Sequence, residues 1–273
     1  MTEGSVPVPA QPSPNPGAKP TRAGEPVLRM TGISKAFGAV QALQNVDFEV
    51  YAGEVVGLVG DNGAGKSTLV KAISGVNPPD TGEIFVGGRR VTISQPQDAT
   101  RWGIETVYQD LALSDNLDVV ANMYLGREDI TPLGLDETKM EVETLRVLKQ
   151  LDVKTLKSVR TPVAQLSGGQ RQSIAVARTI LRNPRVVLLD EPTAALGVAQ
   201  TKQVLNLIRA LREQGLGVVV ISHNLADIFE VVDRVIVMRL GRRVATFDIH
   251  ETTPEQVVGA ITGAEFGAAA AEQ

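Results

Sequence analysis

The spacing of hydrophobic residues predicts an antiparallel sheet in the first third of the chain. Residues 27–30 and 46–50 alternate apolar and polar positions, as half-buried strands do. Residues 83–86 and 91–93 are short apolar segments on either side of a glycine pair, which indicates a hairpin. We expect these strands to form an accessory sheet beside the main one.

A second pattern predicts a parallel sheet with crossover helices. The run at 186–189 is continuously apolar, as expected for a strand buried on both faces. Further strands are expected at 55–59, 104–108, 217–222, 235–238 and 243–247. Helices are expected from Leu69 onward, at 96–102, 118–126, 136–151, from 170 to Asn183-Pro184, at 199–213 and at 225–232. This alternation indicates an α/β fold.

One helix offers a specific test of packing. Over 136–151, Met140, Val147 and Leu151 share one stripe, with Leu145 and Leu148 beside it. A stripe of this width is typical of a helix packed on a core. Residues 131–134 are expected to separate this helix from the preceding one.

Composition narrows the class of protein. The 273 residues are 43% hydrophobic and 21% charged, which is ordinary for a soluble globular protein. The net charge of −4 argues against a nucleic-acid-binding surface. The chain has no cysteine, which excludes disulfides and thiolate metal sites. No apolar run approaches the roughly 18 residues of a membrane span, so a partner would supply any span.

The first 26 residues differ from the rest. They contain seven of the fifteen prolines and almost no large apolar residue. This composition predicts a disordered tail, and the missing apolar segment argues against a signal peptide. The Ala-rich end, residues 264–273, is expected to be a flexible tail.

A glycine-rich loop lies between the strand at 55–59 and a helix. Its residues are Gly60, Asp61, Asn62, Gly63, Ala64, Gly65, Lys66, Ser67 and Thr68. Strand, glycine-rich loop and helix are the context of a phosphate-binding P-loop. Lys66 would reach the β- and γ-phosphates of a nucleotide, and the Ser67 hydroxyl would bind Mg²⁺. The alternative is a glycine-rich turn with a surface lysine.

Two carboxylates follow the buried strand at 186–189. Ligands of open α/β sheets bind at this end of the strands. Asp190 is placed to bind Mg²⁺, and Glu191 is the candidate general base that polarises water. The alternative is a pair of turn carboxylates before Pro192.

A second helix start that contains glycine lies earlier in the chain, at Ser167, Gly168, Gly169 and Gln170. Backbone N–H groups and a hydroxyl there could bind a second phosphate. An ordinary serine-capped helix is the alternative. Because one P-loop already serves one nucleotide, a second phosphate site suggests a head-to-tail dimer.

Together these motifs resemble the ATP-binding subunits of ATP-binding-cassette transporters, over residues 27 to about 263. The ordered set is the P-loop, Gln109 after a strand, Leu-Ser-Gly-Gly-Gln at 166–170, Val-Val-Leu-Leu-Asp-Glu at 186–191 and Ser222-His223. The resemblance implies a P-loop NTPase fold with a RecA-like parallel-sheet core, an antiparallel β subdomain and an α-helical subdomain at about 110–182.

The resemblance also implies roles for single residues. Two copies would enclose two ATP molecules, each between one P-loop and the other copy's Ser167–Gln170 segment. Gln109 would contact Mg²⁺ and the attacking water, and His223 would contact the γ-phosphate. A strand-end histidine bonded to backbone is the alternative for His223. Phe37 would stack on adenine, unless it is a core residue.

One segment departs from the family. After Pro192-Thr193 the family usually has Ser-Ala-Leu-Asp, whose aspartate bridges the dimer. This chain has Ala194-Ala195-Leu196-Gly197. Communication between the two ATP sites is therefore in doubt, and no role is transferred to Gly197.

Three further segments are similar to monosaccharide importers of the ribose, xylose and fructose class, in particular to single-cassette members. They are 108–113, 191–198 and 221–225. The implied partners are membrane permease subunits, a second copy and, indirectly, an extracytoplasmic sugar-binding protein, with the chain on the cytoplasmic face of the membrane. The alternatives are a soluble cassette ATPase and a regulatory module without turnover; Glu191 argues against the latter.

Overall fold

The computed structural model describes residues 24–132, 134–153 and 155–264. The two expected tails lie outside these residues, except for 24–26 and 264. The strands are β1 Leu28–Phe37, β2 Val40–Val50, β3 Val55–Val59, β4 Thr81–Val86, β5 Arg89–Val91, β6 Ile104–Val107, β7 Ile130–Thr131, β8 Gly134–Leu135, β9 Val186–Asp190, β10 Gly217–Ile221, β11 Arg234–Arg239 and β12 Arg242–Asp248. The helices are α1 Lys66–Ile73, α2 Pro96–Arg101, α3 Val119–Tyr124, α4 Glu137–Gln150, α5 Gly168–Ile180, α6 Val198–Glu213, α7 Leu225–Val231 and α8 Pro254–Thr262, with short 3₁₀ turns at Val163–Gln165 and Ile249–Glu251.

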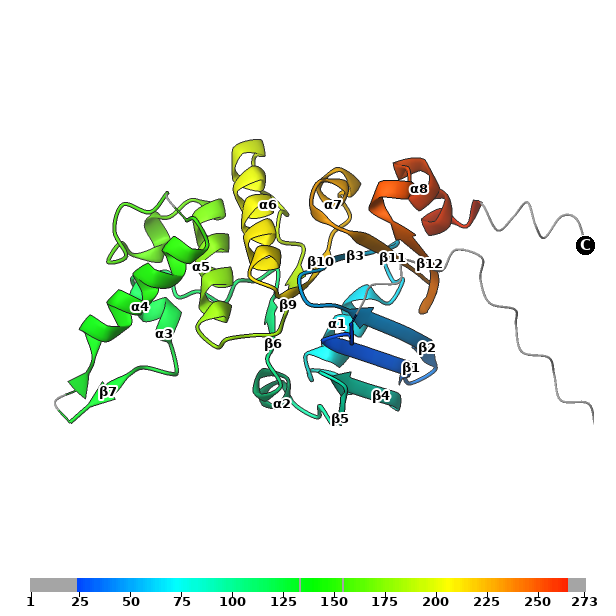
Figure 1. Cartoon of the computed structure of the whole chain (residues 1–273), viewed down its shortest axis with the longest axis horizontal. Coiled ribbons are helices and arrows are strands. Elements are labelled where there is room, and N and C mark those ends of the chain that lie inside the picture. Colours follow the sequence, from blue (N-terminus) through cyan, green and yellow to red (C-terminus); the bar gives the residue numbers. More distant parts are fainter. Residues whose placement is uncertain (1–23, 133, 154, 265–273) are drawn as a thin grey trace, which may run out of the picture.

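A six-stranded sheet forms the centre of the molecule, in the order β12-β11-β3-β10-β9-β6. All neighbours in it are parallel except β12, which pairs antiparallel with β11. The expected α/β fold with parallel crossovers is confirmed. Figure 1 shows α6, α7 and α8 on one side of this sheet and α1 with the antiparallel strands on the other.

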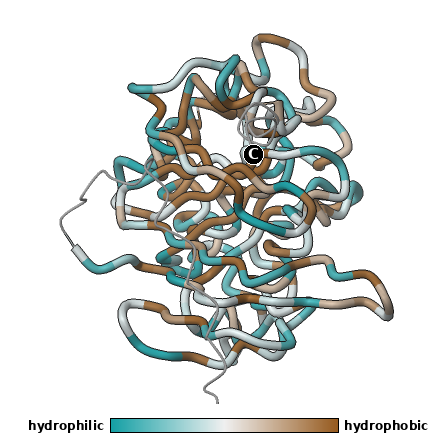
Figure 2. The backbone as a smooth tube through the Cα atoms, turned by 90° about the vertical axis from the view of Figure 1, so that its right-hand side faces the viewer, coloured by the Kyte–Doolittle hydropathy of each residue, from teal (hydrophilic) through white to brown (hydrophobic). Residues whose placement is uncertain are grey.

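Side chains on alternate positions of the central strands enter two different cores. Val187 and Leu189 pack with the helices, whereas Val186 and Leu188 pack with α1 and the antiparallel sheet. This period of two explains why the strands are continuously apolar, since each face is covered. In Figure 2 the hydrophobic stretches run through the middle of the molecule.

The accessory sheet has the order β2-β1-β4-β5 and is antiparallel throughout, as expected. Its first two strands are longer than predicted and form one hairpin through Lys35 and Phe37. Register shifts interrupt that pairing, and Asn45 has a left-handed φ of 50°. Such bulges break the alternation on which a prediction depends. The β4–β5 hairpin turns at Gly87-Gly88, and β5 ends at Val91 rather than at residue 93.

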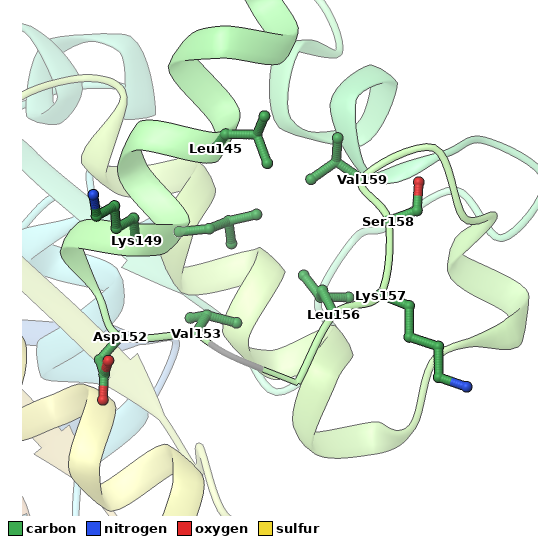
Figure 3. A pocket seen from close by; sticks show the side chains of 9 residues that line it. Leu145, Lys149, Asp152, Val153, Leu156, Lys157, Ser158 and Val159 are labelled. Carbon is green, nitrogen blue, oxygen red and sulfur yellow. The ribbon is translucent and has the colours of Figure 1, made fainter.

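The stripe predicted for α4 is only partly correct. Met140, Val147, Leu148 and Leu151 are buried, but Leu145 is half exposed. Leu145 lines a cavity of about 260 Å³ between α4 and the segment that follows it (Figure 3). The other lining residues are Leu148, Lys149, Asp152, Val153, Leu156, Lys157, Ser158 and Val159. None of them is a predicted site residue.

Two elements were not predicted. The short β7–β8 hairpin occupies the segment expected only to separate two helices, and α8 follows the last strand. Helix α8 begins with a capping box between Thr253 and Gln256. No helix among the described residues is both long and apolar enough to cross a membrane.

Candidate active site

The carboxyl ends of four parallel strands meet at one edge of the central sheet. In spatial order these strands are β3, β10, β9 and β6. The P-loop follows β3, Ser222-His223 follows β10, Asp190 ends β9, and Gln109 lies two residues after β6. Because the strands are parallel and adjacent, segments that are far apart in sequence lie side by side at the edge where ligands bind in such sheets.

The P-loop requires glycine at two positions for steric reasons. Gly60 has a φ of 146°, and a Cβ there would collide with the carbonyl oxygen of Met238. Gly65 has a φ of 103°, and its Cβ would lie 2.8 Å from the carbonyl oxygen of Ala42. Gly65 is also the N-cap of α1 and provides no side-chain cap. The first N–H groups of α1 are therefore left for an anion.

Lys66 is buried at the base of this loop. Its Nζ donates to the carbonyl oxygens of Gly60, at 2.6 Å, and Asp61, at 2.9 Å. Burial lowers the pKa of Lys66, while the carboxylates of Glu191, Asp61 and Asp190 oppose that shift. The ammonium group thus lies among three acidic side chains from two of the strand ends.

Asp190 lies in an environment that disfavours its charged form. Burial raises the pKa of its carboxyl group, and the neighbouring Glu191 raises it further. Lys71 and Lys66 act in the opposite direction. A cation bound here would relieve the cost of ionising Asp190.

Glu191 and His223 are in direct contact. Glu191 Oε2 lies 2.8 Å from His223 Nδ1, and the His223 side chain is 74% exposed. Glu191 has a left-handed φ of 50°, and its N–H donates to the Ile221 carbonyl oxygen at 2.9 Å. The partner of the His223 ring is therefore a carboxylate, not the backbone of the alternative interpretation.

Sequence reasoning missed a link that fixes the loop after Glu191. The Thr193 hydroxyl donates to Asp227 Oδ2 at 2.6 Å, which ties this loop to α7. A threonine after a proline carries no sequence signal of a partner 34 residues away. Only the adjacency of β9 and β10 brings the two together.

The Ser167 segment forms a capped helix start. Ser167 Oγ accepts from the Gln170 N–H at 3.3 Å, and Gln170 Oε1 accepts from the Ser167 N–H at 2.9 Å. A Cβ on Gly168 would lie 2.9 Å from Leu196, and one on Gly169 would lie 3.0 Å from Gln200. The two glycines thus allow close packing on α6, and Ser167 and Gly168 remain exposed.

The Ser167 segment is not part of the cluster at the strand ends. Figure 1 shows α5 and α1 on opposite sides of β6 and β9. Among the described residues, no hydrogen bond or ion pair joins Ser167, Gly168, Gly169 or Gln170 to the P-loop. The two predicted phosphate-binding elements therefore face different surroundings within one chain.

Phe37 ends β1 at the surface. Its side chain is 47% exposed, and Lys35 Nζ lies 5.7 Å from the ring centroid. Asp80 binds the same Lys35 ammonium at 2.7 Å. The alternative of a buried core phenylalanine is wrong, and the ring has a free surface for stacking.

Comparisons with known proteins agree on one family. The sequence model of the ABC transporter family matches residues 43–194. The fructose import ATP-binding protein FrcA of Rhizobium meliloti is 45% identical over 88% of this chain and 95% of its own length. The xylose/arabinose import ATP-binding protein XylG of Sulfolobus acidocaldarius is 42% identical over 88% and 96%. The chain spans about half of the ribose import protein RbsA of Caldanaerobacter subterraneus, at 39% identity.

Solved structures agree with the sequence relatives. The ADP conformation of MJ1267, an ATP-binding cassette of an ABC transporter, superimposes with a TM-score of 0.74 at 25% identity, covering 88% of this chain and 96% of that one. The cassette MJ0796, in a dimeric post-hydrolysis state with ADP and phosphate, gives a TM-score of 0.68 at 25% identity, covering 81% and 98%. The fold, the motifs at the strand ends and these relatives agree. The chain belongs to the ABC transporter family and is an ABC-type ATPase that binds ATP.

Proposed function

We propose that the chain hydrolyses ATP to drive import of a monosaccharide through a membrane permease. The observation that carries the proposal is the set of four adjacent strand ends that bear the P-loop, His223, Asp190 with Glu191, and Gln109. The import class is supported by relatives named for fructose, xylose/arabinose and ribose import. The same names favour a transporter subunit over a soluble cassette ATPase.

ATP binding engages the P-loop first. Glycines at 60 and 65 allow the loop to adopt left-handed backbone angles and to pass close to the carbonyls of Met238 and Ala42, where a Cβ would collide. Lys66 exchanges its bonds to two loop carbonyls for bonds to the β- and γ-phosphates. Since the ammonium is buried and already surrounded by oxygen atoms, it needs little reorganisation to do so. Asp61, Asn62, Gly63 and Ala64 complete the loop, and Thr68 joins the site from the first turn of α1.

The donor set at the strand ends fits Mg²⁺. Ser67 supplies a hydroxyl, Asp190 a carboxylate and Gln109 an amide oxygen, and Mg²⁺ prefers such hard oxygen ligands. The raised pKa of Asp190 supports this assignment, because a dication offsets its desolvation. Bound Mg²⁺ would neutralise charge on the phosphates. Glu191 accepts the proton of the attacking water, and His223, 2.8 Å away, orients Glu191 and reaches the γ-phosphate.

Each ATP site is completed by a second copy of the chain. The exposed Ser167 and Gly168 are placed to bind phosphate on the partner copy's nucleotide, together with Gly169 and Gln170. Phe37 stacks on adenine from the P-loop side. The relative MJ0796, a dimeric cassette bound to ADP and phosphate, supports this arrangement.

The remaining assignments concern organisation. We assign residues 27–263 to one ATPase domain, with 110–182 as its helical subdomain. The domain acts at the cytoplasmic face of the membrane, bound to permease subunits that receive sugar from an extracytoplasmic binding protein. The chain itself has no need to contact sugar.

Uptake in the organism of origin tests the proposal. Deletion of the chain should abolish uptake of one radiolabelled sugar among fructose, xylose, arabinose and ribose. Wild type and Arg209→Lys, a surface change on α6, should restore uptake, whereas Glu191→Gln should not. Unchanged uptake of all four sugars after deletion would contradict the import function, and full rescue by Glu191→Gln would contradict the hydrolytic role.

A further inference from the structure

An arginine of α5 binds the segment that follows Gln109. Arg178 Nη1 donates to the carbonyl oxygen of Ala112, and Nη2 donates to that of Leu111, both at 2.9 Å. Two parallel bonds from one planar guanidinium fix the position and the direction of these carbonyls. The bound carbonyls lie two and three residues after Gln109. The arginine therefore anchors the C-terminal end of residues 109–112, which we call the Gln109 turn.

Arg178 is itself fixed from behind. Arg127 Nη2 donates to the Arg178 carbonyl oxygen at 2.7 Å and to that of Met123 at 3.2 Å. Arg182, just past the end of α5, pairs with Glu105 of β6 at 3.0 Å. The C-terminal end of α5 and the residues just after it are therefore bound both to β6 and to the segment that follows β6.

No carboxylate receives a hydrogen bond from Arg178 among the described residues; both of its side-chain bonds go to backbone carbonyls. Burial lowers the pKa of Arg178, with Arg182 acting in the same direction. The carboxylate of Glu105 opposes this shift only in part, so the charged group costs folding free energy here. This cost favours a role that needs the two carbonyls fixed over a role in general stability.

The segment that Arg178 binds is strained. Ala112 has a φ of 49°, in the left-handed region that alanine rarely adopts. The Ala112 N–H donates to Asp110 Oδ1 at 3.2 Å, which restrains the turn locally. A strained turn persists only when its surroundings determine it, and the two bonds from Arg178 are part of these surroundings.

We propose that Arg178 is a positioning residue that fixes Gln109 at the ATP site and ties its position to the Ser167 end of α5. The inference rests on the proposed role of Gln109. Arg178 lies ten residues after Gly168, about 15 Å along the helix axis. When the Ser167 segment closes on the partner copy's ATP, α5 carries the Gln109 turn with it. One rigid helix thereby joins the two half-sites that each chain contributes.

A mutant cycle on the full-length chain tests the proposal. The variants are Arg178→Lys, Gln109→Ala and the double mutant, with kcat and KM for Mg-ATP and the Tm measured for each. Lysine keeps the charge but cannot bind two carbonyls as a planar fork does. Arg209→Lys is the matched control, because Arg209 also donates to a backbone carbonyl, that of Glu230 at 3.1 Å, away from the site.

We expect Arg178→Lys to lower kcat about tenfold, the effect of a small misplacement, with KM for ATP within about twofold of wild type. In the Gln109→Ala background the same change should lower kcat by less than about twofold, since the positioned group is gone. Two outcomes would overturn the role of Arg178 without touching the role of Gln109. One is an equal loss of kcat in both backgrounds, and the other is no loss in Arg178→Lys while Gln109→Ala is impaired. Full activity of Gln109→Ala would overturn the role of Gln109 and this inference with it.

A second variant covers the case in which Arg178→Lys does not fold. Ala112→Gly leaves the arginine in place but frees the backbone at the carbonyl that it binds. Glycine adopts the observed φ without strain, so the Tm should change little while kcat falls at least threefold. A wild-type kcat in Ala112→Gly would count against the proposal.

Discussion

At the scale of single residues, burial disfavours the charged forms of two side chains in the candidate site. Lys66 is a buried cation among the carboxylates of Glu191, Asp61 and Asp190, and Asp190 is an anion that burial pushes toward its neutral form. In the absence of nucleotide this arrangement costs stability. The same preorganisation is useful once phosphates and a dication enter, because the charges are then compensated.

The raised pKa of Asp190 predicts a gain in stability on neutralisation. A carboxyl group with a raised folded-state pKa destabilises the fold while it is ionised, and this penalty disappears as the pH falls through that pKa. Asp190→Asn should therefore raise the Tm by about 1–3 °C at pH 7.5 in EDTA without nucleotide. The gain over wild type should shrink toward pH 4.5.

Differential scanning fluorimetry over this pH range measures the effect. Asp115→Asn, at an exposed carboxylate, is the control and should change the Tm little at any pH. A lower Tm for Asp190→Asn at pH 7.5 would mean that the carboxylate stabilises the fold, contrary to the burial argument.

The proposed role of Glu191 in hydrolysis can be tested separately from ATP binding. Glu191→Gln keeps the shape of the side chain but removes the base, so kcat should fall by about 10²–10⁴-fold. ATP binding should persist, since the P-loop is untouched. Steady-state hydrolysis and equilibrium binding of a fluorescent ATP analogue check both, with the surface change Glu213→Gln as control. Equal hydrolysis rates for wild type and Glu191→Gln would remove Glu191 from the mechanism.

At the scale of elements, the sequence predicts what local periodicity determines. The strand–loop–helix around Lys66 and the apolar strands β9 and β10 follow from their own residues. The full length of β1 and β2 does not, because register shifts set by a partner strand interrupt their alternation. Leu145 fits a core stripe by spacing, but its exposure depends on what the segment after α4 covers.

The candidate site shows the same limit. The position after a buried strand selected Asp190 and Glu191, and the resemblance to the family selected Gln109 and His223. The parallel sheet brings their segments to one edge. The contacts of Arg178 with the carbonyls of Leu111 and Ala112 were not predictable, since any carbonyl can accept from an arginine. Such links depend on tertiary packing and carry no motif.

Two capping boxes allow helix stability to be separated from function. Ser167 with Gln170 caps α5, and Thr253 with Gln256 caps α8. Removal of either hydroxyl, in Ser167→Ala or Thr253→Ala, should cost about 1 kcal/mol and lower the Tm by about 2–4 °C. Only Ser167→Ala should also lower kcat, by at least about tenfold, because only that hydroxyl is proposed to contact phosphate.

Thermal melts and ATPase assays on the two variants make the comparison. If Thr253→Ala loses as much kcat as Ser167→Ala at equal loss of Tm, the Ser167 segment acts only as a helix start.

At the scale of the whole molecule, the proposed function assigns two separate parts of the chain to two different ATP sites. The P-loop, Asp190 and Glu191 share one sheet edge, while the Ser167 segment packs on the start of α6, beside Leu196 and Gln200. Gly197 is the N-cap of α6 in an extended conformation, and a Cβ there would meet open space. Neither packing nor backbone conformation therefore requires glycine at position 197, and Gly197→Asp should be tolerated with an unchanged Tm.

Mixing two inactive variants tests whether each ATP site is shared between two copies of the chain. Lys66→Ala disables the P-loop and Ser167→Arg blocks the second half-site, so each homodimer should be inactive. A heterodimer contains one intact site, so an equimolar mixture should recover about a quarter of wild-type ATPase activity. A mixture that forms heterodimers, detected by differently tagged chains, yet remains as inactive as either variant alone would contradict the shared site.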